Sequence, residues 1–138
     1  MDRVLFSSAN EVWATPQDLF DELNAEFNFN LDPCALPTNA KCAKFFTPED
    51  DGLAQDWSGH RVFCNPPYGR KIAAWVKKCH DEAQKGTKVV MLIPARTDTS
   101  YFHDYIYHKA EIRFIRGRLK FGNAQQGAPF PSMIVIYN

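Results

Sequence analysis

The sequence lacks an excess of charge of either sign. Its 138 residues include 16 Lys and Arg and 16 Asp and Glu, which gives a formal net charge of +0. Such a balance excludes a protein that holds nucleic acid by bulk charge alone, although it is compatible with a local basic patch. The chain also lacks an apolar run of about 18 residues, the length that predicts a membrane span. It begins MDRVLFSSAN, without the apolar stretch of a signal peptide, so we expect a cytoplasmic protein.

Cysteine pairs with the CxxC spacing are absent as well. The chain has 4 cysteines, each beside apolar or small residues: Cys34, Cys42, Cys64 and Cys79. We expect reduced thiols that serve as small hydrophobic residues. A zinc site made by Cys34, Cys42 and a histidine is an alternative, but the usual spacing of zinc ligands is missing. We therefore predict that no metal is bound.

Apolar strand patterns alternate with amphipathic helix patterns along the chain. Helices are expected from Thr15-Pro16 onward, with Thr15 as N-cap, over residues 72–84 before Gly86, and over residues 100–107. Strands are expected at residues 29–32, 44–46, 61–64, 88–93, 112–121 and 133–137.

This order predicts an α/β fold with a mostly parallel sheet. The last two strands have no helix between them, so we expect them to pair antiparallel at the C-terminal edge. The length fits one compact domain over residues 1–138, with residues 1–14 as an irregular N-terminal arm. No separate target recognition domain fits beside it. Ligands in such sheets gather at the carboxyl ends of the strands.

The most informative motif is Asn65-Pro66-Pro67-Tyr68, directly after the expected strand 61–64. The two prolines force the chain out of the strand, because neither can donate a backbone hydrogen bond. The Asn65 side chain and the Pro66 carbonyl then offer two acceptors to one amino group, and the Tyr68 ring can stack on a flat heterocycle. The alternative is a purely structural role, in which the prolines make a turn that ends the strand and Tyr68 belongs to the core. A ligand of WW domains would need Pro-Pro-x-Tyr, which is not the spacing here.

The tetrapeptide resembles the signature of amino-methyltransferases that use S-adenosylmethionine, Asn/Asp/Ser-Pro-Pro-Tyr/Phe/Trp. The segment Trp13–Phe20, with its Thr-Pro pair, resembles the cofactor-side motif that begins the gamma-type order of these enzymes. Leu31–Ala35 lies where the first cofactor motif belongs, and Asp51-Gly52-Leu53 lies just ahead of the catalytic motif. Over residues 11–137 the chain resembles the short phage-type, Dam-like DNA N6-adenine methyltransferases.

The resemblance implies a Rossmann-like class I methyltransferase sheet. It also implies methyl transfer from S-adenosylmethionine to the exocyclic N6 amine of adenine in DNA, with Asn65, Pro66, Pro67 and Tyr68 as the catalytic residues. The glycine-rich turn that usually follows the first cofactor motif is missing after Asp32. The residues expected to bind the cofactor are Thr15, Pro16, Asp32, Pro33, Cys34, Ala35, Asp50 and Asp51.

Basic residues concentrate near the expected strand 112–121. Strand alternation would put Arg116, Arg118 and Lys120 on one face, where they could contact DNA phosphates. An exposed edge protected by charge is the alternative. The loop 122–131 carries Asn123, Gln125 and Gln126, side chains that can read adenine edges. The residues expected to contact DNA are Arg70, Lys71, Arg96, Arg116, Arg118 and Lys120.

Two other functions fit the same motif. One is methylation of RNA or of a protein glutamine, since Asn-Pro-Pro-Tyr also occurs in such enzymes. The other is a module that binds DNA or a partner and has lost cofactor binding. The sequence indicates neither a recognition sequence, nor a preference for single or double strands, nor an oligomeric state.

Overall fold

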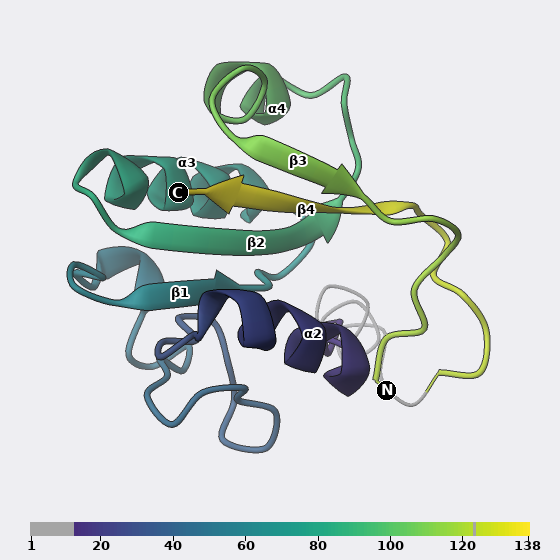
Figure 1. Ribbon diagram of the computed structural model, residues 1–138, viewed down its shortest axis with the longest axis horizontal. Helices are drawn as coiled ribbons and strands as arrows, with labels where there is room; N and C mark the ends of the chain where they lie inside the picture. The colour runs from purple at the N-terminus through teal and green to yellow at the C-terminus, as the bar shows by residue number, and fades with distance from the viewer. Residues whose placement is uncertain (1–12, 123) are drawn as a thin grey trace.

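A mixed sheet forms the centre of the computed structural model, which describes residues 13–122 and 124–138 (Figure 1). Its strands are β1 (Arg61–Cys64), β2 (Lys88–Pro94), β3 (Glu111–Phe114) and β4 (Ser132–Tyr137), in the order β1-β2-β4-β3. β1 and β2 are parallel, whereas β4 is antiparallel to both β2 and β3. The antiparallel C-terminal pair is therefore confirmed. The sheet is not mostly parallel as predicted, because the reversed strand β4 lies between β2 and β3.

Beyond β1 the sheet continues only as single bridges. Leu31 pairs in parallel with Val62, and Asp32 pairs in parallel with Phe45. These two bridges replace the predicted strands 29–32 and 44–46. Pro33 follows at once and has no N–H to continue a ladder, which accounts for the short pairing.

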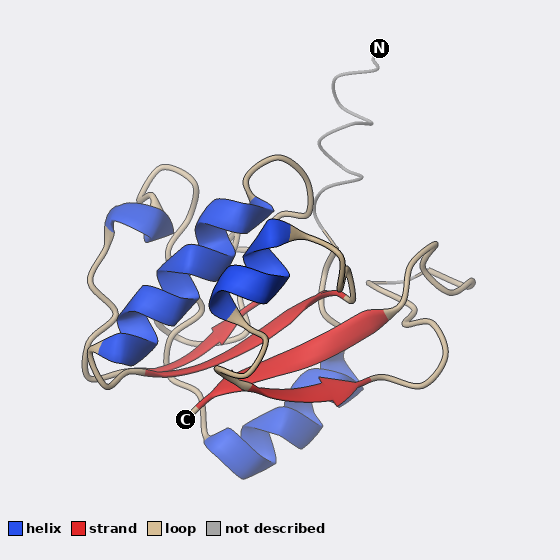
Figure 2. Cartoon of the chain, turned by 90° about the horizontal axis from the view of Figure 1, so that it is seen from above, coloured by secondary structure: helices blue, strands red, loops and turns tan. Residues whose placement is uncertain are grey.

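Helices cover both faces of the sheet. They are α2 (Gln17–Phe27), α3 (Ile72–Gln84) and α4 (Ser100–Tyr105), with a 3₁₀ turn η1 at Gly52–Ala54. Figure 2 shows α3 and α4 on one face and α2 on the other. The three predicted helices are confirmed, although α4 ends two residues early. Most of the predicted N-terminal arm lies outside the described residues.

The prediction that Thr15 caps the first helix is wrong. The residue before α2 is Pro16, in an extended conformation, and no side chain caps the helix. The Thr15 hydroxyl instead accepts a hydrogen bond from the Asn65 side chain, 2.9 Å away. The Thr15 hydroxyl is therefore engaged in a tertiary hydrogen bond and does not cap the helix.

The predicted strand 112–121 ends early, at Phe114. One more backbone bond, from Ile115 N to Ser132 O, follows the strand. Gly117 then has a φ of +76°, which turns the chain away from an extended path. Strand alternation therefore does not align Arg116, Arg118 and Lys120, and that prediction is wrong. We call residues 115–131 the basic loop; it joins β3 to β4.

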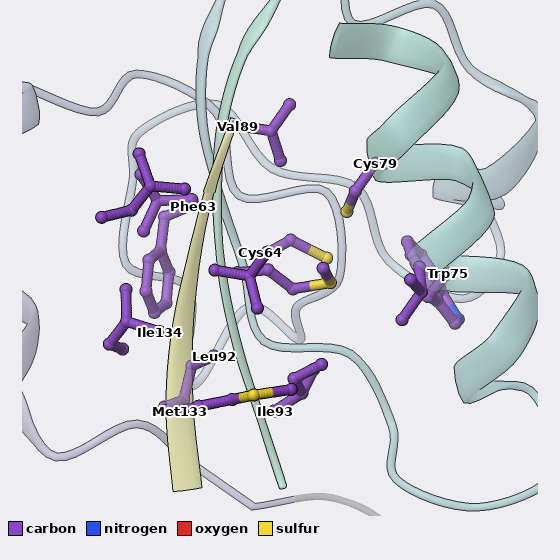
Figure 3. Close-up of a cluster of buried hydrophobic side chains, with 14 of the residues drawn as sticks. Phe63, Cys64, Trp75, Cys79, Val89, Leu92, Ile93, Met133 and Ile134 are labelled. Carbon is purple, nitrogen blue, oxygen red and sulfur yellow. The ribbon is translucent and has the colours of Figure 1, made fainter. Parts of the chain in front are cut away.

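The core lies on both sides of β1 (Figure 3). Phe63 points toward α2 and packs against Phe20 and Phe29, with ring centroids 5.2 and 5.3 Å apart. Cys64 points the other way, toward Cys79 and Trp75 of α3. All four cysteines are free thiols, and Cys64 and Cys79 are fully buried. This packing fixes β1, and with it the point where the next residues leave the sheet.

Candidate active site

A cavity opens where β1 ends, and we call it the main cavity. Four segments form most of its wall: Trp13–Thr15, Asp32–Leu36, Phe46–Pro48 with Asp51–Leu53, and Asn65–Pro67. Lys71 and Trp75, from the start of α3, also line it, as do Asn39, Lys41 and Phe63. The wall therefore combines the predicted catalytic motif with three of the segments predicted to bind a cofactor.

Gly52 lets two of these segments approach closely. A Cβ atom at this position would lie 2.1 Å from the carbonyl oxygen of Pro33, so any other residue would push the segments apart. Trp57, fully buried, holds the same turn by donating a hydrogen bond from Nε1 to the Gly52 carbonyl at 3.0 Å. The backbone at Gly52 is thus part of the cavity wall.

The acidic residues before Gly52 differ in what they face. Asp51 lines the main cavity and has a φ of +57°, a conformation uncommon for any residue with a side chain. Asp50 is used locally, because its carboxylate accepts hydrogen bonds from the Thr47 amide and hydroxyl at 2.9 and 3.0 Å. Of the two predicted ligands, only Asp51 borders the cavity.

Asp32 is a buried acid on the cavity wall. Its carboxylate accepts backbone hydrogen bonds from Cys34 at 3.3 Å and from Lys41 at 3.0 Å. Burial raises the pKa of Asp32 to about 6, although these two bonds work in the opposite direction. A carboxylate has about four lone-pair positions, so two bonds leave acceptor capacity for a ligand.

The Asn65 amide is held on both sides. Its Nδ2 donates to the Trp13 carbonyl at 2.5 Å and to the Thr15 hydroxyl at 2.9 Å. The Tyr68 hydroxyl lies 2.6 Å from Asn65 Oδ1 and 3.1 Å from the Leu92 carbonyl, and it can donate its proton to either. Burial raises the pKa of Tyr68, so this hydroxyl stays protonated.

A second cavity, which we call the aromatic pocket, borders the motif at Tyr68. Tyr68, Trp13, Phe130 and Arg96 line it. The Phe130 ring meets Tyr68 and Trp13 edge-on, with centroids 5.6 and 5.2 Å apart. The motif therefore contributes Asn65–Pro67 to the main cavity and Tyr68 to the aromatic pocket, while Trp13 borders both.

Comparison with known proteins agrees with this geometry. The family described as DNA N-6-adenine-methyltransferase (Dam) matches residues 4–138. The chain belongs to this family. A DNA N-6-adenine-methyltransferase of Haemophilus phage HP1 is 31% identical over 138 aligned residues, covering 94% of this chain and 80% of the relative. One of Escherichia phage T1 is 30% identical over 114 residues, covering 81% of this chain and 48% of the relative.

Family membership confirms the enzyme class predicted from the sequence, an adenine-specific DNA methyltransferase. Within this Dam-family chain, most of the residues predicted to bind the cofactor line the main cavity. Pro16 and Asp50 do not. Those that do are Thr15, Asp32, Pro33, Cys34, Ala35 and Asp51.

The residues predicted to contact DNA are spread over a larger part of the structure than those predicted to bind the cofactor. Lys71 lines the main cavity and Arg96 the aromatic pocket, with its guanidinium 6.0 Å from the centre of the Phe130 ring. Arg118 donates a hydrogen bond to the Ala128 carbonyl at 3.3 Å. The others are exposed on the surface: Arg70, Arg116 and Lys120.

Sequence reasoning missed the aromatic pocket. Phe130 lies in a loop without a regular pattern, and the Thr-Pro motif that contains Trp13 predicts no contact for its ring. Phe130 stands between two prolines, a setting that pins a ring in a loop and was the one available signal.

Among residues 13–122 and 124–138, no helix is long and apolar enough to cross a membrane. Within the same ranges, no group of three or more His, Cys, Asp or Glu side chains is arranged to hold a metal ion.

Proposed function

We propose that this chain transfers a methyl group from S-adenosylmethionine, bound in the main cavity, to N6 of an adenine held in the aromatic pocket. The observation that carries the proposal is that the motif Asn65–Tyr68 borders both cavities, Asn65–Pro67 lining the main cavity and Tyr68 the aromatic pocket. A methyl donor in the main cavity and a methyl acceptor beside Tyr68 would meet at Asn65, which lines the main cavity and contacts the Tyr68 hydroxyl.

The residues of the main cavity fit this cofactor. Asp32 retains lone pairs that can accept hydrogen bonds from an ammonium group. Asp51 borders the cavity, and its carboxylate accepts no hydrogen bond from the described part of the chain, so this carboxylate is available to ribose hydroxyls. Gly52 keeps the wall free of a side chain at its closest approach. When bound, the cofactor supplies a methyl group on a positively charged sulfonium.

A Rossmann-like class I sheet is part of the same proposal. The bridges at Leu31 and Asp32 continue the sheet in parallel beyond β1, and β4 runs against its neighbours near the other edge. Such a sheet binds ligands beyond the carboxyl ends of its parallel strands, which is where the main cavity lies.

Asn65 and Pro66 would act on the amine of the target base. The N6 lone pair of adenine is delocalised into the ring, so the amine is a poor nucleophile. Two acceptors, Asn65 Oδ1 and the Pro66 carbonyl, favour a tetrahedral nitrogen whose lone pair is free to attack. Fixed acceptors of this kind avoid reorganisation during the reaction. The Tyr68 ring would hold the base after it leaves the duplex, a step that costs a few kcal/mol.

The DNA backbone would be held by the exposed basic residues near the aromatic pocket. Arg96 lines that pocket, and Arg116, Arg118 and Lys120 stand on the basic loop, with Arg70 and Lys71 after the motif. In the same loop, Gln125 and Gln126 are exposed and available to read base edges. Asn123 lies outside the described residues. A DNA substrate implies activity in the cytoplasm of a bacterial host.

The test is transfer of a labelled methyl group from S-adenosylmethionine to unmethylated DNA, with RNA and a glutamine-containing protein as parallel substrates. We expect label on N6 of adenine in DNA alone. Asn65→Ala should lower the rate by about 10²–10³-fold, because an organising acceptor is lost. Its affinity for the cofactor should change little. Wild-type turnover in folded Asn65→Ala protein, or label on another substrate, would contradict the proposal.

A further inference from the structure

The segment that precedes α2 contacts the catalytic motif directly. Trp13 and Thr15 are about fifty positions from Asn65 in the sequence, yet both accept hydrogen bonds from its Nδ2. Thr15 is only 5% exposed, so water does not compete for this bond. The two donor hydrogens of the Asn65 amide are therefore both used within the protein.

These hydrogen bonds determine the orientation of the Asn65 side-chain amide, that is, the positions of its oxygen and nitrogen. The last torsion of an asparagine side chain has two broad, nearly equivalent positions that exchange the oxygen and the nitrogen. The Trp13 carbonyl can only accept a hydrogen bond, so it selects the position in which Nδ2 faces it. Asn65 Oδ1 then points away from the N-terminal segment, where the Tyr68 hydroxyl lies 2.6 Å from it.

From these contacts we infer that Thr15 is a positioning residue that acts through Asn65. Its hydroxyl is the second acceptor for Nδ2 and restrains the amide in the orientation that the Trp13 carbonyl selects, so that Oδ1 faces the target amine as an acceptor. The inference rests on the proposed role of Asn65 and changes the role expected for Thr15, which the sequence assigned to cofactor binding. The segment before α2 would then serve methyl transfer itself.

A second consequence concerns the amino acid at position 65. A carboxylate there would keep acceptor oxygens for the amine but would have no hydrogen to offer the Trp13 carbonyl. Two oxygens would face each other at the distance now occupied by a hydrogen bond. Asn65→Asp should therefore lose at least as much activity as removal of the Thr15 hydroxyl.

The experiment compares Thr15→Val, which replaces the hydroxyl with a methyl group, and Thr15→Ser, which keeps the hydroxyl. Thr87→Val is the matched control, because Thr87 is equally buried, lies before β2 at the far end of the sheet, and has an Oγ1 without a partner among the described residues. Single-turnover methyl transfer to DNA is measured at saturating cofactor, and cofactor affinity is measured separately by calorimetry.

We expect Thr15→Val to lower the single-turnover rate about tenfold, the usual effect of one buried hydrogen bond. Cofactor affinity should stay within about twofold, Thr15→Ser should restore most of the rate, and Thr87→Val should leave it unchanged. In an Asn65→Ala background, Thr15→Val should have no further effect on the rate, since the two residues act through one contact. If Thr15→Val does not fold, Thr15→Ala beside Thr15→Ser gives the same contrast.

Several outcomes would overturn the inference. A weaker cofactor affinity with an unchanged rate at saturation would make Thr15 a cofactor contact. Additive effects of Thr15→Val and Asn65→Ala would mean a general structural role. An active Asn65→Asp protein would show that no donor is needed at position 65. If instead Asn65→Ala itself keeps the wild-type rate, the proposed function fails, and that result is separate from the behaviour of Thr15.

Discussion

The main cavity and the basic loop lie at the same end of the sheet, but their backbones are held differently. The wall of the main cavity is tied by hydrogen bonds between segments, such as Trp57 to Gly52 and Ala35 N to Phe46 O. The basic loop is tied to other segments by hydrogen bonds from Gly122 N to Ala14 O and from Ala95 N to Pro131 O. Two buried rings, Phe121 and Phe130, anchor it further by packing against Trp13, while its basic side chains stay exposed. A cofactor site needs binding groups held in fixed positions. A surface that binds DNA needs a loop backbone that is anchored and basic side chains that stay exposed.

Breaking the cavity wall should have the largest effect. Gly52→Ala places a Cβ atom 2.1 Å from the Pro33 carbonyl oxygen, so the two segments must separate. We expect the free energy of unfolding to fall by about 1–3 kcal/mol, as for overpacked cores. Cofactor affinity should fall by more than about tenfold, because two sides of its site move apart. Thermal unfolding and calorimetric titration measure both.

Gly59→Ala is the control for this change. Gly59 has a φ of +79° but its Cβ atom would meet nothing within 4 Å, so alanine adds only backbone strain. That strain costs roughly 1–2 kcal/mol and should leave cofactor affinity unchanged. Equal loss of affinity in both variants would mean that stability, not the shape of the wall, controls binding.

Tyr68 belongs to both regions, since its hydroxyl contacts Asn65 and its ring packs against Phe130. Tyr68→Ala should weaken binding of the target base by about 1–3 kcal/mol, the usual contribution of an aromatic stacking partner. Tyr68→Phe keeps the ring, so binding of the target base should weaken by only about 0.5–1.5 kcal/mol, the contribution of the lost hydrogen bond. Binding is measured with DNA that carries a mismatched adenine.

Tyr137→Phe serves as the matched control for Tyr68→Phe. Tyr137 is also buried, and its hydroxyl donates to the Tyr105 carbonyl at 2.5 Å, outside both cavities. It should reduce stability without changing DNA binding. If Tyr68→Phe were as damaging as Tyr68→Ala, the ring would not be the main contribution of Tyr68.

The buried acid of the main cavity gives a pH prediction. Since the pKa of Asp32 is about 6, its carboxylate is ionised at pH 7 and mostly protonated at pH 5. If it accepts the cofactor's ammonium group, affinity should fall about tenfold between these two values. Asp32→Asn should bind weakly with no such pH dependence. A wild-type affinity that is flat from pH 5 to 7 would remove Asp32 from cofactor binding.

The contribution of Asp32 to stability should change with pH in the opposite direction to cofactor affinity. The folded pKa of Asp32 lies above its ordinary value of 3.8, so the protonated form is favoured by folding. Its contribution to stability is fully present below pH 3.8 and is lost as pH rises through about 6. Unfolding of the cofactor-free wild type and of Asp32→Asn across this range measures the difference.

The smallest effect is expected on the basic loop. Replacing Arg116 and Arg118 with Gln should weaken DNA binding severalfold and flatten the slope of log affinity against log salt by about 2. Both side chains are exposed, so cofactor affinity should not change, and stability should fall by no more than about 1 kcal/mol for the hydrogen bond from Arg118 to the Ala128 carbonyl. An unchanged salt slope in the folded double variant would leave Arg70, Lys71 and Arg96 as the DNA contacts.

The sequence predicted the elements that depend on local patterns. The helix at residues 72–84 and the buried strand β2 follow from apolar periodicity, and the carboxyl-end position of Asn65 follows from the prolines after it. The early end of β3 was not predictable from alternation, because Gly117 breaks the extended path within a run that still looks like a strand. Local sequence cannot tell a glycine that turns the chain from one that continues a strand.

The errors at the site have a different cause. Thr15 has the right position for an N-cap, but a distant amide, that of Asn65, takes its hydroxyl. Likewise Asp50 and Asp51 are neighbours with the same chemistry, and only the backbone turn at Asp51 decides which one faces the cavity. Such choices depend on contacts between segments, which no single stretch of sequence contains.

The central position of β4 has a consequence for how this sheet is completed. β2 and β3 each pair with β4 and not with each other, and all six residues of β4 are buried. A chain made only as far as residue 131 would therefore hold two strands with open edges facing a gap. Open edges of apolar strands recruit other chains. Insertion of β4 is thus the step that closes the sheet and protects the nascent chain from aggregation, whereas a chain truncated at residue 131 stays exposed.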